Sequence, residues 1–266
     1  MRFDQPNNQT IIKPIDQINF RFYPVILVLF VTTWISSDIA AIKLVNVFGI
    51  TLTGGFIAFP FTTMFGNVIA EVYGYKNARL SIWLGTLADF IFVVSLYIVC
   101  ILPPSDHWSL NNEFKTILFP GMRIVLASVV SLFIAEFLNS YLMAKMKINS
   151  NGRSLFKRVF VSCALSFFID IVLYLTLAFY AVLPTAILIS MIMYAYLKKI
   201  ICQLLLYPVA RLIIQYLKRI EKVDIFDYQT DFSPFSSDNI YDIKCVTRIN
   251  AENKIINCGI GDHVIV

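Results

Sequence analysis

Six apolar runs, separated by short polar segments, constrain this chain more than any other feature. The first five cover residues 22–42, 55–73, 80–102, 124–144 and 159–183, and the last covers 185–217. A helix needs about 20 apolar residues to cross the ~30 Å hydrocarbon core of a membrane. Only 15% of the residues are charged, against roughly 25% in ordinary soluble domains, so the chain cannot cover an apolar core with a polar surface. The sequence therefore predicts an all-α integral membrane protein, a bundle of six transmembrane helices.

The last apolar run is too long for a single span, because as one helix it would extend about 50 Å. Lys198 and Lys199 interrupt it. We therefore expect an interfacial or re-entrant piece near 185–195, followed by a span over 199–216. The membrane domain then covers 22–217, between a polar N-terminal segment, 1–21, and a C-terminal tail, 218–266. The first run has no small-residue cleavage site soon after it, which favours a retained span over a removable signal peptide.

The C-terminal tail contains one stretch with a recognisable pattern. Residues 243–258, IKCVTRINAENKIINC, alternate enough to predict a small hairpin with a turn near 250–253. A frayed tail is the alternative interpretation.

Basic residues are distributed unequally between the two sides that the spans define. One side holds thirteen Lys and Arg residues, among them Lys147, Arg158 and Lys218, and the other holds Lys43, Lys115 and Arg123. Cytoplasmic loops carry such an excess. The net charge of +5 is therefore explained without a nucleic-acid partner, and both termini are expected in the cytoplasm, with membrane lipid around the helices.

Metal and histidine chemistry have few ligands in this chain. The two histidines, His107 and His263, lie outside the apolar runs, and no C-x-x-C pair occurs among the five cysteines, with Cys245 and Cys258 as a weak exception. No H-E-x-x-H or G-x-S-x-G pattern occurs either. We therefore expect no cofactor and no enzymatic activity.

Ionisable and amide side chains inside the runs indicate a polar interior. Buried charges are expensive in a membrane and usually face a cavity or the bundle interior. Ser162, Ser166, Asp170 and Tyr174 recur every four residues and form one polar stripe on a helix. The other polar residues within or bordering the runs are Asp38, Glu71, Asp89, Glu136, Asn139, Lys199 and Gln203. Helix-end positions for Glu71 and close packing for the serines are the alternatives.

Such a lining suits a planar heterocycle that carries hydrogen-bond donors. A carboxylate can accept two parallel N–H bonds, and aromatic rings can cover the flat faces.

The amino-acid sequence of the apolar runs resembles that of one protein family. Residues 56–85, FIAFPFTTMFGNVIAEVYGYKNARLSIWLG, resemble the signature of the queuosine precursor transporters, also called the vitamin uptake transporter family. The resemblance continues with SSDIAAIK, RIVLASVVSLFIAEFLNSYLMAKMK, KRVFVSCALSFFIDIVLYLTLAFY, YLKKIICQLLLYP and FDYQTDFSPF. It covers roughly residues 24–235.

The resemblance implies import of a deazapurine base across the bacterial inner membrane for queuosine synthesis in transfer RNA. The substrate would be 7-cyano-7-deazaguanine, 7-aminomethyl-7-deazaguanine or queuine. It also implies a bundle similar to the six-helix substrate-binding subunits of energy-coupling-factor vitamin importers, working without their ATPase module. The candidate substrate-binding residues are Asp38, Phe59, Asn67, Glu71, Glu136, Asn139, Asp170, Lys199 and Gln203.

Two departures from the family pattern lead to a further hypothesis. This chain has Asp38 where the family usually has Asn, and Asn67 where the family usually has Asp. A third departure is Ser166-Phe167 in place of Gly-Gln, and together they leave the choice of substrate open. If the first two positions serve one site, Asp38 and Asn67 face one another across the first two spans. The alternatives for the whole protein are a subunit of an ATP-driven importer, a membrane-embedded enzyme and a purely structural membrane protein.

Overall fold

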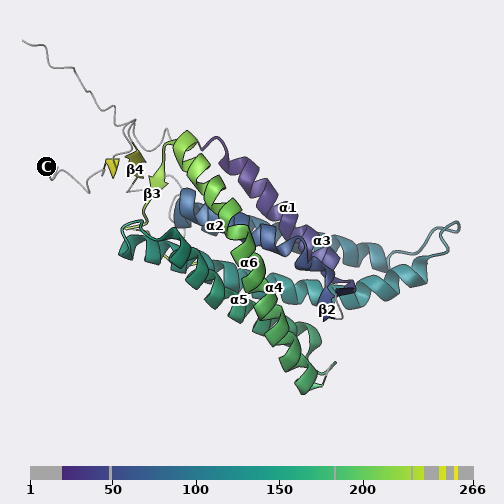
Figure 1. Ribbon diagram of the computed structural model, residues 1–266. Coiled ribbons are helices and arrows are strands. Elements are labelled where there is room, and N and C mark those ends of the chain that lie inside the picture. Colours follow the sequence, from purple (N-terminus) through teal and green to yellow (C-terminus); the bar gives the residue numbers. More distant parts are fainter. Residues whose placement is uncertain are drawn as a thin grey trace, which may run out of the picture.

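The helices form an elongated bundle in the computed structural model, which describes residues 20–47, 50–182, 184–228, 230–236, 246–249 and 255–256 (Figure 1). The helices are α1 (Tyr23–Ala41), α2 (Phe59–Val72), α3 (Gly74–Ile101), α4 (Asn111–Asn149), α5 (Leu155–Phe179) and α6 (Thr185–Glu221), with a short 3₁₀ turn, η2, at Gly54–Phe56. Pro24 and Pro60 lie in the first turns of α1 and α2, where a missing N–H breaks no helical hydrogen bond.

Five of these helices, α1, α3, α4, α5 and α6, are long and apolar enough to cross a membrane. Their outward faces carry large apolar side chains, for example Leu87 at 55%, Phe90 at 52% and Leu205 at 70% exposure. Apolar surface this extensive is not kept in contact with water by a soluble protein. The chain is therefore an all-α, multi-pass membrane protein.

The predicted second span takes a different form. Within 55–73, the α-helix α2 has only 14 residues, and ten of these are buried by the surrounding helices. A helix of this length is typical of a bundle core. Gly55 lies against Ser37 and Ala41 near the end of α1, whereas Tyr73 stacks edge-on against Tyr23 at the start of α1. The segment from η2 to Tyr73 therefore runs back along the whole of α1.

The last apolar run is one continuous helix, so the expected break before Lys199 is wrong. Helix α6 has 37 residues, with Pro208 inside it. The two lysines do not interrupt it because neighbouring helices supply their partners: Lys199 pairs with Asp170 of α5, and the Lys198 ammonium lies 5.7 Å from the Phe56 ring centroid.

Short strands lie at both ends of the bundle. Strands β1 (Leu44–Val47) and β2 (Ile50–Thr53) pair antiparallel after α1, with Leu44 opposite Thr53. At the other end, β3 (Asp224–Ile225) pairs with β4 (Val246–Ile249), close to the end of α6 (Figure 1). Strand β5 (Ile255–Ile256) pairs antiparallel with β4, which confirms the predicted hairpin. Its expected turn, 250–253, lies outside the described residues.

The core joins α1, α2, α5 and α6. It contains Phe30 and Trp34 of α1, Val68 and Ile69 of α2, Phe167 and Ile171 of α5, and Ile214 and Leu217 of α6. Helix α2 therefore lies at the centre of the apolar packing and fixes the surrounding helices relative to one another.

Candidate functional site

A cavity of about 450 Å³ lies among α1, α2, α4, α5 and α6. This volume is within the roughly 300–1,000 Å³ typical of small-molecule sites. Its walls come from the last turns of α1, the start of α2, the second half of α5 and the first half of α6, with Ser128 and Leu132 from α4. The cavity therefore lies toward the end of the bundle where α1 ends and α6 begins.

An ion pair between Asp170 of α5 and Lys199 of α6 lies in the wall of the cavity. The Asp170 side chain is 5% exposed and that of Lys199 is 15% exposed. Each charge is compensated by the other, and their attraction offsets much of the desolvation cost of burying both. The polar stripe of α5 is thus confirmed as a buried face, because Ser162, Ser166 and Asp170 are all buried.

Two phenylalanine rings flank this ion pair. The Phe59 and Phe167 ring centroids are 5.9 Å apart. The Lys199 ammonium lies 3.4 Å from the Phe59 centroid, over the ring face, which is favourable for a cation. The cavity therefore presents an aromatic face, a cation and a carboxylate in one place.

Three further polar side chains in the cavity wall are only partly satisfied. The Thr63 hydroxyl contacts the Gln203 side-chain oxygen at 3.5 Å. The Gln203 amide nitrogen and the Tyr174 hydroxyl are buried and find no hydrogen-bond partner among the described residues. Buried polar atoms normally have partners, so these groups have hydrogen-bonding capacity left for a ligand.

Asp38 also lines the cavity, but it does not pair with Asn67. Its Oδ1 accepts a hydrogen bond of 2.6 Å from the Ser128 hydroxyl of α4, and its carboxyl lies beside that of Asp89 of α3. Asn67 has other partners on α4 and α5. The two side chains therefore have different hydrogen-bond partners, and the structure gives no support to the hypothesis that they face one another in one site.

Asn67 belongs to a closed ring of three buried side chains. Asn139 Nδ2 donates to Asn67 Oδ1 at 2.9 Å, Asn67 Nδ2 contacts Cys163 Sγ at 3.3 Å, and the Cys163 thiol contacts Asn139 Oδ1 at 3.8 Å. These side chains line no part of the cavity. The ring connects α2, α4 and α5, as interhelical hydrogen bonds do in membrane bundles.

Glu136 lies behind the cavity, against the backbone of α2. A Cβ atom added to Gly66 would lie 2.8 Å from Glu136 Oε2. A larger residue at position 66 would therefore have to displace this carboxyl group. Glu136 does not line the cavity.

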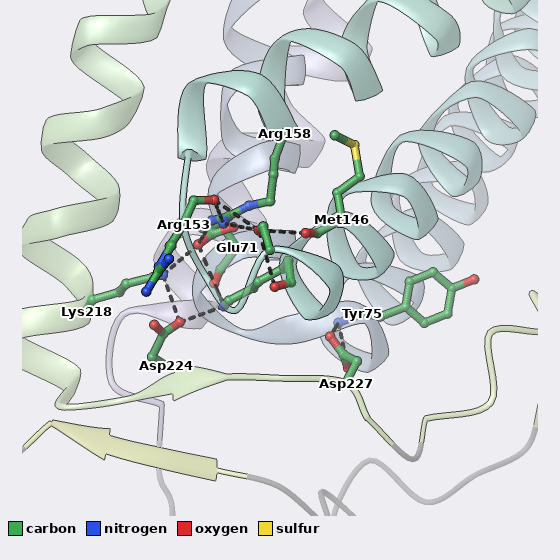
Figure 2. Close-up of polar contacts among 10 residues, drawn as sticks. Glu71, Tyr75, Met146, Arg153, Arg158, Lys218, Asp224 and Asp227 are labelled. Atoms are coloured by element: carbon green, nitrogen blue, oxygen red, sulfur yellow. Dashed lines mark hydrogen bonds and ion pairs between the residues drawn. The ribbon is translucent and has the colours of Figure 1, made fainter. Parts of the chain in front are cut away.

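Glu71 lies at the opposite end of the bundle, in a group of five charged residues that we call the charged cluster: Glu71, Lys147, Arg158, Lys218 and Asp224 (Figure 2). Glu71 Oε1 lies 2.7 Å from Arg158 Nη2, 2.6 Å from Lys218 Nζ and 3.7 Å from Lys147 Nζ. Asp224 Oδ1 lies 2.6 Å from Lys147 Nζ and 2.8 Å from Lys218 Nζ.

The charged cluster joins the ends of α2, α4, α5 and α6 to strand β3. Lys147 and Arg158 are each 2% exposed, and Glu71 is 1% exposed. The expectation that these two basic residues lie in loops was therefore wrong, because Lys147 belongs to the last turn of α4 and Arg158 to the first turn of α5. Glu71 is neither part of the cavity nor a helix-end residue that reaches the lipid headgroups.

The segment after β3 packs against the start of α3, next to the charged cluster. The Tyr75 backbone N–H donates to the Asp227 carboxylate at 3.1 and 3.2 Å (Figure 2). The Tyr75 hydroxyl donates to the Phe232 carbonyl at 2.8 Å, and the Trp83 indole donates to the Pro234 carbonyl at 3.0 Å. Burial raises the pKa of the Asp227 carboxyl, and the Tyr75 hydrogen bond opposes that shift.

The same contacts explain the E-V-Y-G-Y-K-x-A-R segment in physical terms. Gly74 has a φ of +78°, and a Cβ atom there would lie 2.8 Å from the Ile225 side chain. Arg79 Nη1 donates to the carbonyls of Asp231 and Ser233 at 3.3 and 3.0 Å. The segment therefore binds the chain that follows α6, a role that the sequence alone did not predict.

The structure thus divides the nine candidate residues into two groups. Five line the cavity: Asp38, Phe59, Asp170, Lys199 and Gln203. Four lie elsewhere: Asn67 and Asn139 in the buried ring, Glu136 behind the cavity and Glu71 in the charged cluster. Sequence reasoning missed Thr63 and Phe167 as lining residues. The four-residue spacing of Thr63 from Phe59 could have indicated a shared helix face.

These features define a multi-pass helical membrane protein with a cavity of small-molecule size between its helices. The family described as "Putative vitamin uptake transporter" matches residues 53–213, and the chain belongs to that family. It is 26% identical over 179 residues to the "Probable queuosine precursor transporter" of Bacillus subtilis (strain 168), across 66% of this chain and 77% of that protein. No solved structure matches the chain. The chain is therefore a membrane transporter of the vitamin uptake and queuosine precursor transporter family.

Proposed function

We propose that this transporter imports a 7-deazaguanine base, a precursor of queuosine in transfer RNA, across the bacterial inner membrane. The substrate is 7-cyano-7-deazaguanine, 7-aminomethyl-7-deazaguanine or queuine. The name of the Bacillus relative supports the queuosine precursor as substrate class. The protein works in this proposal as a secondary transporter that needs no ATPase module.

The observation that carries the proposal is the Asp170–Lys199 pair beside Phe59 and Phe167. A deazaguanine presents a ring N–H next to an exocyclic amine, and a carboxylate accepts two such parallel hydrogen bonds. A flat base can stack on a phenyl ring in the place that the Lys199 ammonium takes in this structure. Substrate binding would therefore displace Lys199 from both Phe59 and Asp170.

The positions of the cavity and the charged cluster support an outward-facing state of the transporter. With α1 starting in the cytoplasm, the charged cluster lies on the cytoplasmic side, and the cavity lies toward the outside. The cluster joins the ends of α2, α4, α5 and α6 by ion pairs, so it would close the cytoplasmic exit while the cavity receives substrate. In this orientation the η2–α2 segment, second in chain order, also crosses the membrane and brings the number of passes to six. Both termini are then cytoplasmic.

Uptake of labelled base by a bacterium that lacks its own synthesis and import tests this function. We expect the wild-type protein to restore uptake of at least one of the three bases. Asp170→Asn should reduce it about tenfold or more, because a buried charged hydrogen-bond partner contributes roughly 1.5–3 kcal/mol. Asp106→Asn, in the exposed 102–110 connection, is the matched control and should transport normally.

The charge-swapped variant, Asp170→Lys with Lys199→Asp, separates recognition from folding. It keeps an ion pair between α5 and α6 but moves the carboxylate to the other helix. We expect thermal stability near that of the wild type and no uptake. Wild-type uptake by this variant, or by Asp170→Ala, would mean that the Asp170 carboxylate does not bind the base.

A further inference from the structure

Two carboxyl groups, Asp38 of α1 and Asp89 of α3, lie within hydrogen-bonding reach of each other inside the bundle. They are 4% and 0% exposed. Two carboxylates at this separation repel strongly where water cannot screen them, and the repulsion is removed when one of them holds a proton. A pair of this kind titrates as a unit.

Among the described residues, no cation forms an ion pair with either acid. The groups that face Asp38 from the other helices are Asp89 of α3, Ser128 of α4, and Asp170 and Tyr174 of α5. The nearby cation on α6, Lys199, is paired with Asp170. The two acids therefore differ from Asp170 and Glu71, both of which contact cations.

The unpaired atoms around the two acids point to a bound proton. Asp38 Oδ2 and both Asp89 oxygens are buried and have no hydrogen-bond donor among the described residues. The fully buried indole N–H of Trp34 lies beside the Asp89 carboxyl and can donate to one of its oxygens only, so the oxygens between the two acids still lack a donor among the described residues. A proton between the two carboxyl groups would supply the missing donor.

Only one of the two acids is in contact with the cavity. Asp38 and Ser128 line the cavity, whereas Asp89 does not. A proton can therefore enter from the cavity through Asp38 and be held by both acids. Ionisable groups in such positions form the proton relays of membrane transporters.

We propose that Asp38 and Asp89 form a shared proton site that couples movement of the substrate to movement of a proton in the same direction. The inference rests on the proposed transport function and adds its energy source. Because Asp38 of the proton site and the Asp170–Lys199 pair line one cavity, both sites are exposed to the same side of the membrane at the same time. Alternating access of that cavity then moves proton and substrate together.

Purified protein in liposomes tests the coupling directly. The membrane potential is clamped, a pH-sensitive dye is enclosed, the outside is made more acidic, and labelled base is added. Since a tenfold concentration ratio of protons drives at most a tenfold ratio of a neutral co-substrate at 1:1 coupling, we expect up to about tenfold accumulation per pH unit. The interior should acidify as the base enters. Accumulation driven by a sodium gradient at equal pH, or mere equilibration in every gradient, would overturn the proposal.

An exchange assay distinguishes failure of coupling from failure of transport. Vesicles preloaded with unlabelled base take up labelled base without any gradient if the protein carries that base. If exchange is absent for all three bases, the proposed function fails, and the coupling fails with it. If exchange is present but a pH gradient has no effect, only the proton site is wrong.

Two variants assign the coupling to these residues. We expect Asp89→Asn to lose accumulation in the pH gradient while it still exchanges base, because Asp89 does not reach the cavity. Asp38→Asn is the second variant if the first does not fold, and Asp106→Asn, in the exposed connection before α4, is the control. The infrared intensity from protonated carboxyl groups should be lower in both variants than in the wild type, and any remaining band is assigned to Glu136, a further buried carboxyl, by Glu136→Gln. Wild-type accumulation by both variants would refute the site.

Discussion

The two ends of the bundle hold their buried charges in opposite ways. At the charged cluster, one carboxylate oxygen, Glu71 Oε1, contacts three cations from three different helices. In the cavity, Asp170 pairs with one cation, Lys199, and no cation in the described part of the chain pairs with Asp38. The Tyr174 hydroxyl and the Gln203 amide beside them have no partner among the described residues.

This difference shows where the structure is closed and where it has room for a ligand. Breaking a buried ion pair leaves an uncompensated charge, so the charged cluster resists separation of its helices. Polar groups without partners gain free energy when a ligand supplies them. The cavity end therefore has unused hydrogen-bonding capacity around a single ion pair. At the cluster end every charged side chain contacts an opposite charge, and the unpaired atoms there, Glu71 Oε2 and Arg158 Nε, belong to side chains that already form ion pairs.

Reporter fusions test the comparison most strongly, because their result is all or none. A reporter that is active only outside the cytoplasm should be inactive when fused within 147–153, next to the charged cluster. It should be active when fused within 106–115, which covers the end of the α3–α4 connection and the first turn of α4. Immunoblots should show equal amounts of both fusions. The reverse pattern would place the charged cluster outside and the cavity on the cytoplasmic side.

Glu71→Gln should give the largest change in stability. It leaves Lys147, Arg158 and Lys218 buried or partly buried with only Asp224 as an anion. Removing one partner of a buried ion pair typically destabilises by about 3–5 kcal/mol. We expect a large drop in the thermal unfolding temperature of the detergent-solubilised protein.

Glu113→Gln is the control for this variant, because Glu113 is exposed in the first turn of α4. It should unfold at the wild-type temperature. Equal stability of the Glu71 variant and this control would mean that the charged cluster does not hold the helices together.

Much of the fold followed from local patterns. Four predicted spans, 22–42, 80–102, 124–144 and 159–183, lie largely within α1, α3, α4 and α5, because apolar run length directly reflects membrane thickness. The polar stripe through Asp170 was also correct, since a four-residue spacing defines one face of a helix whatever its neighbours are.

The errors concern relations between helices, which local patterns do not contain. Whether Asp38 meets Asn67 or Ser128 depends on the rotation of α1 against α2 and α4. Lys198 and Lys199 were expected to interrupt the last run, because the partner of Lys199, Asp170, lies on another helix. Likewise Lys147 resembles a loop cation until Glu71 and Asp224 are placed beside it. Which side chains pair across helices depends on the tertiary structure, and the local sequence pattern does not contain it.

The smallest predicted effect is a change in unfolding stability that differs between two tyrosine-to-phenylalanine variants. It tests whether the polar groups at the cavity end contribute to substrate binding rather than to stability. Tyr23 contacts the Ser81 hydroxyl at 3.0 Å and donates to the Asn77 carbonyl at 3.2 Å, so Tyr23→Phe should destabilise by about 0.5–1.5 kcal/mol. The buried Tyr174 hydroxyl has no partner among the described residues.

Tyr174→Phe removes an unsatisfied polar group, so it should leave the unfolding temperature unchanged or raise it. Because the same hydroxyl lines the cavity near Asp170, base uptake should nevertheless fall. Destabilisation of Tyr174→Phe equal to that of Tyr23→Phe would show that its hydroxyl supports the fold, and the contrast between the two ends would not extend to this residue.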